Sequence, residues 1–376
     1  MALYTQLIAH FRERILDGSL PTGARLPTEL ELADRYKISR GTVRQAMGVL
    51  VNEGFLERVQ GRGTFVRALP AAQENQNKAS EKRIGLLLSY AFSELDLDIL
   101  VGVEHAAKSR GYQVSFAYTE ESAEQQTRDI NWLRADHVLG LIIYPLSNID
   151  YDESIWGLRA EGLPFVLVDR YFPKLESDHV ASDNVGGAYR ATEHLIILGH
   201  RRIVFVYSHH GGLVTTSVRD RHEGYRKALA AYGVAYDPSL VLQLPHPSKD
   251  DTHNPYEEIL RRPDHPTAIF TTVDVEAVAF LRHAQALGLR IPEDIALVGF
   301  DNLRLTSQLH PPLTTVAQSC RDMGMRAANL LINRIEGQAG PPQHIELPTN
   351  LIIRESCGAH LHVKNLPANV NTLPGK

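Results

Sequence analysis

Apolar residues in the first part of the chain recur with the period of a helix. They stand four residues apart, at Leu3, Leu7, Phe11 and Ile15. This spacing predicts one face of an amphipathic helix, which Asp17-Gly18 ends. Thr28, followed three residues later by Glu31, forms a capping box that predicts a second helix as far as about Tyr36.

A third helix and a hairpin follow in the pattern. Ser39 is a favourable N-cap residue, and the apolar face of the third helix is expected at Val43, Ala46, Met47 and Leu50. Segments 55–59 and 64–67 have the composition of strands, and residues 60–63, Gln-Gly-Arg-Gly, supply the turn between them. Helices followed by a hairpin predict a winged helix-turn-helix, an α+β DNA-binding domain, over residues 1–67.

The third predicted helix carries the candidate DNA contacts. In a helix-turn-helix, the first residues of this helix enter the major groove. Arg40 and Arg44 share one helix face, and an arginine can hold a guanine with two hydrogen bonds. Thr42 can reach a phosphate or a thymine methyl group. In the wing, Gly61 allows close approach of the backbone to DNA, and Arg62 can enter a minor groove. The alternative is a solvated helix face and a wing tip that touches nothing.

These residues lie within three specific motifs. The motifs G-x-x-LPTE-x-x-LA, SR-x-TVR-x-A-x-x-x-L and QGRGTFV together resemble the GntR-type DNA-binding domain. The resemblance implies operator contacts from the third helix and the wing, at Arg40, Thr42, Arg44, Gln60, Gly61 and Arg62. Thr28 and Gly41 complete the predicted DNA-binding set. Many members of this family carry a DNA-contacting arginine where this chain has Leu30, so that contact is expected to be missing or replaced.

The rest of the chain has a different pattern. Residues 68–82 lack an apolar period and predict a flexible linker. Over residues 83–358, short apolar segments of strand type alternate with amphipathic helical segments. Such repeated β-α-β units predict parallel sheets covered by helices, and two series of units predict an α/β domain of two lobes. Residues 359–376 have no period and are expected to form a loose tail.

Polar and aromatic residues follow several predicted strands of this α/β domain. Ligands of such sheets bind beyond the carboxyl ends of the strands, in this case between the lobes. The candidates for binding an effector are Tyr90, Phe92, Tyr144, Asp169, Arg221, Asp301 and Gln318. Carboxylates and arginine hold hydroxyl groups, and aromatic rings lie against sugar C–H groups, so the set favours a sugar. Alternatively, some of these groups are buried ion pairs or helix caps, a role that Asp183 before Gly186 would suit.

Long motifs of the second domain point to the same kind of site. DNVGGAYRATEHLIILGHRRIVFV, R-x-x-GYRKAL, IPEDIALVGFDN and PPLTTV-x-Q resemble the effector-binding domain of the lactose/galactose repressor family, which is similar to periplasmic sugar-binding proteins. The resemblance implies a two-lobed, periplasmic-binding-protein-like fold. It also implies effector contacts at Asp169, Arg221, Asp301 and Gln318. Family members commonly have an effector-binding asparagine at the place of Val273, so one hydroxyl-binding amide is missing here.

Charge is distributed unevenly along the chain. The net charge is −5, but residues 1–67 hold ten Lys/Arg and seven Asp/Glu, a charge of +3, and the remainder carries −8. A basic module on an acidic body suits binding of DNA by the module alone. Cys320 and Cys357 are too few for a disulfide framework, and no Cys/His spacing suggests zinc, so we expect no metal and no cofactor. The absence of a signal-peptide core and of a long apolar run predicts a cytoplasmic protein without a membrane segment.

Together these patterns predict a repressor that is not an enzyme. We expect a homodimer that binds double-stranded, pseudo-palindromic operator DNA, with an affinity controlled by a sugar between the lobes. A purine base or a sugar phosphate as effector, and activation in place of repression, are the alternatives. An exported sugar-binding protein is disfavoured by the missing signal peptide, and an aminotransferase-type fusion by the missing pyridoxal signature. Four histidines lack the partners of a catalytic or metal site: His194, His200, His209 and His210.

Overall fold

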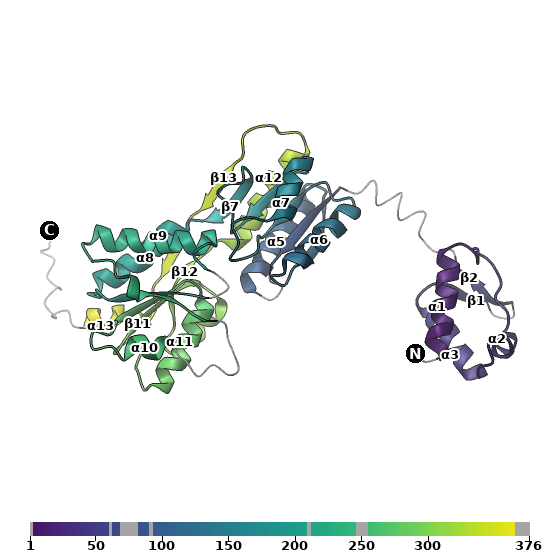
Figure 1. The fold of residues 1–376 in the computed structure, drawn as a ribbon, viewed down its shortest axis with the longest axis horizontal. Helices are drawn as coiled ribbons and strands as arrows, with labels where there is room; N and C mark the ends of the chain where they lie inside the picture. Colours follow the sequence, from purple (N-terminus) through teal and green to yellow (C-terminus); the bar gives the residue numbers. More distant parts are fainter. Residues whose placement is uncertain are drawn as a thin grey trace, which may run out of the picture. The chain divides into compact units, whose positions relative to one another are not determined.

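The computed structural model describes residues 3–59, 62–67, 82–89, 93–208, 212–245 and 255–364. The chain divides into two compact units, Met1–Glu81 and Lys82–Lys376, here called the head and the body (Figure 1). Within the described part of the chain, no helix combines the length and apolar character that crossing a membrane requires.

The head is a winged helix-turn-helix, as predicted. Its elements are α1 (Leu3–Leu16), α2 (Glu29–Tyr36), α3 (Arg40–Asn52), and the antiparallel strands β1 (Leu56–Val59) and β2 (Gly63–Val66). The predicted capping box starts α2, because the Thr28 amide donates to Glu31 Oε2 at 2.7 Å. Ser39 caps α3 by accepting a hydrogen bond from the Thr42 amide at 3.1 Å. The N-termini of α2 and α3 are therefore fixed by local hydrogen bonds.

The first lobe of the body contains a six-stranded parallel sheet between two layers of helices. The strand order is β13-β7-β6-β5-β3-β4. Helices α5 and α12 cover one face and α6 and α7 the other, because successive strand residues enter opposite apolar clusters. The elements are β3 (Arg83–Leu88), α5 (Glu94–Ser109), β4 (Gln113–Tyr118), α6 (Ala123–Ala135), β5 (Leu141–Ile143), α7 (Glu153–Glu161), β6 (Phe165–Val168), β7 (Asp178–Ser182), α12 (Cys320–Ile335) and β13 (His344–Leu347).

The second lobe repeats this architecture with one antiparallel edge strand. Its order is β14-β12-β11-β10-β8-β9, and β14 runs against β12. Helices α8 and α9 lie on one face, and α10 and α11 on the other (Figure 1). The elements are α8 (Asn184–Ile197), β8 (Ile203–Tyr207), α9 (Thr216–Ala231), η1 (Pro238–Leu240), β9 (Val241–Gln243), α10 (Pro255–Leu260), β10 (Ala268–Thr271), α11 (Asp274–Ala286), β11 (Ala296–Asp301), η2 (Arg304–Gln308), β12 (Thr314–Ala317), β14 (Asn350–Ile352) and α13 (Ala359–Lys364).

The chain passes between the lobes more often than two consecutive series of units would require. It crosses after β7, after β12 and after β13. The crossings adjoin one another, since the Asp183 amide donates to the Leu347 carbonyl at 2.7 Å and Ser182 Oγ donates to Gln318 Oε1 at 2.7 Å. The return of α12 and β13 to the first lobe was not predicted. The first six residues of the segment predicted as a loose tail form the short helix α13.

Candidate DNA-binding surface and effector site

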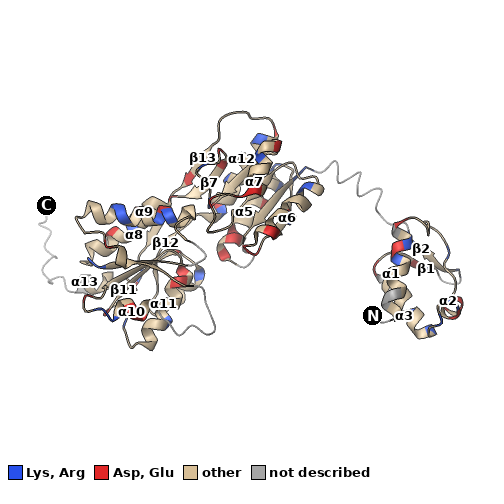
Figure 2. Ribbon diagram, in the orientation of Figure 1, with Lys and Arg blue, Asp and Glu red and all other residues tan. Residues whose placement is uncertain are grey.

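The exposed start of α3 carries the predicted recognition residues. Arg40 and Arg44 are the charged residues of this helix, and both are exposed. Figure 2 marks in blue the positions of lysine and arginine along the ribbon. The Arg44 side chain is 71% exposed, and its Nε donates to Glu29 Oε2 at 3.0 Å. The other oxygen of Glu29 accepts a hydrogen bond from Arg58 Nη2 at 3.3 Å. Glu29 thus pairs with one arginine from α3 and one from the wing. Arg58 is not among the predicted DNA contacts, because nothing in its local sequence pattern marks it.

The other predicted DNA-binding residues have varied surroundings. The Thr28 hydroxyl is occupied within the capping box, where it donates to Glu31 Oε2 at 2.9 Å. Thr42 Oγ1 lies 2.8 Å from Ser39 Oγ, and Gly41 and Arg62 are exposed. Two predicted wing contacts, Gln60 and Gly61, lie outside the described residues.

Three of the predicted effector residues meet at the carboxyl edge of the second lobe. Gln318 Nε2 donates to Asp301 Oδ1 at 2.7 Å, and Arg221 Nη1 lies 3.9 Å from the same oxygen. Arg221 also donates from Nε to Asn184 Oδ1 at 2.9 Å and from Nη1 to the Thr272 carbonyl. Its guanidinium carbon stands 3.8 Å from the centroid of the Phe300 ring. This arginine is therefore held by two hydrogen-bond acceptors, a carboxylate and an aromatic ring.

The matching edge of the first lobe holds a second polar group. Tyr144 Oη donates to Asp169 Oδ2 at 2.9 Å, and Arg170 lies with its guanidinium carbon 4.8 Å from the Tyr144 ring centroid. Arg170 Nη1 donates to Glu121 Oε1 at 3.1 Å and to the Pro145 carbonyl at 3.0 Å. Glu121 is not among the predicted effector residues, because it stands three residues beyond the end of β4. The predicted residues Tyr90 and Phe92 lie outside the described residues.

Asp169 and Asp301, each at the carboxyl end of a strand in its own lobe, have a backbone conformation that L-amino acids seldom adopt. Asp169 follows β6 with φ 63°, and Asp301 ends β11 with φ 125°. Positive φ at residues other than glycine costs about 1–3 kcal/mol and concentrates at functional sites. Both positions lie where ligands of parallel sheets bind.

The two lobes share one electrostatic environment at this boundary. Burial raises the pKa of Asp301 to about 8, the positive charge of Arg221 opposes the rise, and the negative charges of Asp274 and Asp169 add to it. Burial likewise raises the pKa of the Tyr144 hydroxyl, and the charge of Asp169 adds to that rise. The negative charge of Asp169 in the first lobe therefore acts on Asp301 in the second lobe.

Direct hydrogen bonds also join the lobes at their rims. The Asn148 amide donates to Thr215 Oγ1 at 2.7 Å, and the Tyr171 amide donates to Thr216 Oγ1 at 3.0 Å. Between η2 of the second lobe and α5 of the first, the Arg304 amide donates to Glu94 Oε2 at 3.0 Å. The lobes therefore meet in this structure through contacts other than the three crossings.

Comparison with known proteins agrees with both halves of this description. Residues 3–66 match the family described as bacterial regulatory proteins, gntR family, and residues 192–357 match the periplasmic binding protein-like domain. An arabinose metabolism transcriptional repressor of Halalkalibacterium halodurans is 30% identical over 368 residues, which cover 94% of this chain and 96% of the relative. The chain belongs to the arabinose-repressor family of transcriptional regulators.

Solved structures of related regulators share the fold of this repressor-family chain. A complex described as transcriptional regulator CelR with cellobiose has a TM-score of 0.64 and 29% identity, and the match covers 88% of this chain and all of that one. A putative ribose operon repressor from Burkholderia thailandensis has a TM-score of 0.63 and 30% identity, covering 72% of this chain and 99% of that one.

Near the effector site of this repressor-family chain, two acidic residues have structural roles. Asp183 caps α8 by accepting a hydrogen bond from the Gly186 amide at 2.6 Å, and it pairs with Arg190 at 3.1 Å. Asp274 is buried and accepts hydrogen bonds from Thr315 Oγ1 at 2.6 Å and from the Leu303 amide at 3.0 Å. Val273, where the family resemblance implies an asparagine, is the N-cap residue of α11 and forms no side-chain cap hydrogen bond.

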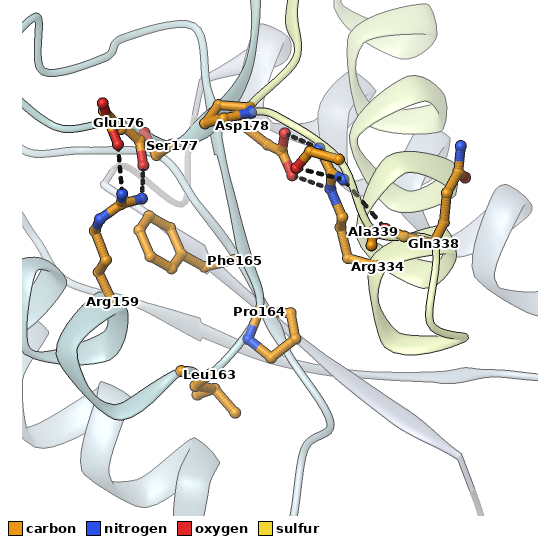
Figure 3. Close-up of a pocket in the computed structure, with 13 residues that line it drawn as sticks. Arg159, Leu163, Pro164, Phe165, Glu176, Ser177, Asp178, Arg334, Gln338 and Ala339 are labelled. Carbon is orange, nitrogen blue, oxygen red and sulfur yellow. Dashed lines mark hydrogen bonds and ion pairs between the residues drawn. The ribbon is translucent and has the colours of Figure 1, made fainter.

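A hollow of about 480 Å³ lies at the opposite, amino-terminal edge of the first lobe's sheet (Figure 3). Its charged side chains pair with each other. Arg159 binds Glu176, and Arg334 donates to both oxygens of Asp178 at 2.7 and 2.9 Å. Because these groups already satisfy one another, the hollow has the character of a structural ion-pair site rather than a ligand site.

Proposed function

We propose that this chain is a transcriptional repressor that binds operator DNA through its head and releases it when a neutral sugar binds between the lobes of its body. The observation that carries the proposal is the pair of buried carboxylates, Asp169 and Asp301, at the carboxyl edges of the two sheets. Each stands in a strained backbone conformation beside an arginine. Carboxylates and arginines are the groups that hold sugar hydroxyls with paired hydrogen bonds.

The state of the arginines supports a neutral effector over a phosphorylated one. A phosphate is held where cationic groups outnumber the anionic ones. The Arg221 guanidinium already donates to Asn184 and to a backbone carbonyl, and Nη1 of Arg170 donates to Glu121 and another carbonyl. Against these two arginines stand several carboxylates, so the site has no excess positive charge to balance a phosphate.

The head supports the DNA-binding half of the proposal. Arg40 and Arg44 are presented on the exposed start of a capped helix, the part of such motifs that enters the major groove. We infer that two chains associate through their bodies and place two heads on a pseudo-palindromic operator. A sugar that prefers one arrangement of the lobes would then change how the heads are held.

The proposal is tested by titrating the full-length protein with a panel of pentoses, hexoses and disaccharides. Arabinose, ribose and cellobiose belong in the panel because they are named for its relatives. We expect one sugar to raise the melting temperature of the body and to weaken operator binding in a gel-shift assay. Sedimentation of the same samples reports whether the chain is a dimer.

The panel also contains the competing effectors. Purine bases and sugar phosphates test the alternative ligand classes, and a rise in operator affinity with any ligand would mean activation rather than release. A melting temperature that no sugar changes, together with a shift by a purine or a phosphorylated sugar, would replace the sugar proposal.

A further inference from the structure

The carboxyl edge of the first lobe holds buried polar atoms that form no hydrogen bond with any described residue. Asp96, in the first turn of α5, is 3% exposed, and its Oδ2 accepts no hydrogen bond among the described residues. Nε of Arg170 donates no hydrogen bond to any described residue and lies 3.8 Å from Asp169 Oδ2, whereas Nη1 of the same side chain donates to Glu121 and to the Pro145 carbonyl. The buried Ser89 hydroxyl, directly after β3, is also without a partner within the described part of the chain. Buried polar groups in folded proteins are normally paired, so each of these atoms requires an explanation.

These atoms adjoin the effector site rather than the interior of the lobe. Glu94, two residues before Asp96, binds the backbone and side chain of Arg304 in the other lobe, at 3.0 and 2.8 Å. The first turn of α5 is therefore at the boundary between the lobes. Burial raises the pKa of Asp96 to about 7, and the charges of Asp169, Arg170 and Glu121 act on it as well. Asp96 thus lies within electrostatic reach of a predicted effector residue.

Other buried carboxylates of the body show what a structural role looks like. Asp178 accepts three hydrogen bonds with its two oxygens, from Arg334 and from the Gln343 amide. Asp274 accepts one hydrogen bond with each oxygen. Asp96 differs because one oxygen is buried with no donor, which opposes folding in the absence of a ligand. Such a group is retained at a free-energy cost, a pattern that concentrates at binding sites.

We propose that Asp96 and Arg170 form a ligand subsite in the first lobe and determine which sugars this repressor accepts. This inference rests on the proposed function. Asp96 Oδ2 accepts a hydrogen bond from one hydroxyl of the sugar, and the Nε–H of Arg170 donates to another sugar oxygen. The subsite selects ligands with a hydroxyl donor and disfavours anions, because Glu121 and Asp169 add negative charge around it. It supplies hydroxyl recognition from the first lobe, on the opposite side of the ligand from Asp301.

The test uses the full-length protein and the sugar found by the panel. Asp96→Asn should weaken sugar binding by about 10- to 100-fold, the range for loss of a charged hydrogen bond. Its ligand-free melting temperature should be equal to or above that of the wild type, because a buried unpaired charge is removed. Asp178→Asn is the matched control, a buried aspartate at the opposite edge of the same sheet, and should lower the melting temperature while leaving sugar affinity unchanged. Arg170→Lys keeps a cation beside Glu121 but lacks the Nε–H, and should weaken binding about tenfold.

Deoxy sugars separate direct contact from an indirect effect. One deoxy sugar lacks the hydroxyl that Asp96 binds. The wild type should bind this deoxy sugar more weakly than the parent sugar, whereas Asp96→Asn should bind the two sugars with equal affinity. If the affinity lost through Asp96→Asn and the affinity lost through the missing hydroxyl add for every deoxy sugar, the subsite is wrong. If the sugar binds wild type and Asp96→Asn alike, the subsite is wrong and the proposed function stands. If no sugar binds the wild type, both are wrong.

Discussion

The arginines assigned to function in the head and in the body have opposite surroundings. Arg44 of the head is largely exposed and has one ion-pair partner, Glu29. Arg221 of the body has a side chain only 4% exposed and is held by Asn184, a carbonyl, an aromatic ring and Asp301. An exposed charge acts on binding with little effect on stability, whereas a buried charge contributes to both. The DNA-binding and ligand-binding properties of the chain should therefore separate under mutation.

The largest effect is expected for Arg221→Ala. The substitution leaves Asp301 and two other acceptors buried without their cation, which should lower the free energy of unfolding of the body by about 3–5 kcal/mol. Sugar binding should be lost as well. Denaturant unfolding followed by circular dichroism measures the first effect, with the head transition as an internal control. A body that unfolds at the wild-type midpoint would mean that this network does not stabilise it.

Arg44→Ala should weaken DNA binding and leave the stability of the protein almost unchanged. Loss of one arginine that reads a base costs about 1–3 kcal/mol of specific binding, so operator affinity should fall toward that for random DNA. Stability should change little, because exposed ion pairs contribute about 0–1 kcal/mol. Fluorescence anisotropy with operator and scrambled duplexes measures the difference. Arg12→Ala is the control. It removes an exposed ion pair between Arg12 on α1 and Glu53 at the end of α3, and should leave specificity for the operator intact.

The same contrast explains what could be predicted from the sequence. In the head, the signals are local: Thr28 and Glu31 are three residues apart and form the capping box observed. In the body, Asp169 and Asp301 were found because each directly follows an apolar strand. Asp96 was not, because it lies within a helix that also carries Asp98 and Glu94, and only packing distinguishes the buried one. The return of α12 to the first lobe depends on contacts with α5, which no local pattern encodes.

The pH dependence of stability tests whether Asp96 is buried and unpaired. An aspartate in an unfolded chain titrates near 3.9, whereas burial raises the pKa of Asp96 to about 7. Between these values the folded state retains a proton that the unfolded state has lost, so this group's contribution to stability is lost as the pH rises. The Asp96→Asn variant should match the wild type near pH 4 and become progressively more stable than the wild type as the pH rises to 8, without sugar. A constant difference in melting temperature across this range would contradict the assignment.

The smallest effect concerns Leu30, which is 49% exposed in the first turn of α2. The resemblance to the GntR-type head implies a DNA-contacting arginine at this place. Leu30→Arg should restore one phosphate contact, raising operator affinity about two- to fivefold and steepening the salt dependence by about 0.9 in log–log slope. Because a cation at a helix N-terminus is unfavourable, head stability should fall by about 0.3–1 kcal/mol. Leu30→Gln removes the apolar side chain without adding charge and should leave the salt slope unchanged. Equal salt slopes for Leu30→Arg and Leu30→Gln would place this position away from the DNA backbone, and the arginines of α3 and the wing would then supply the binding without it.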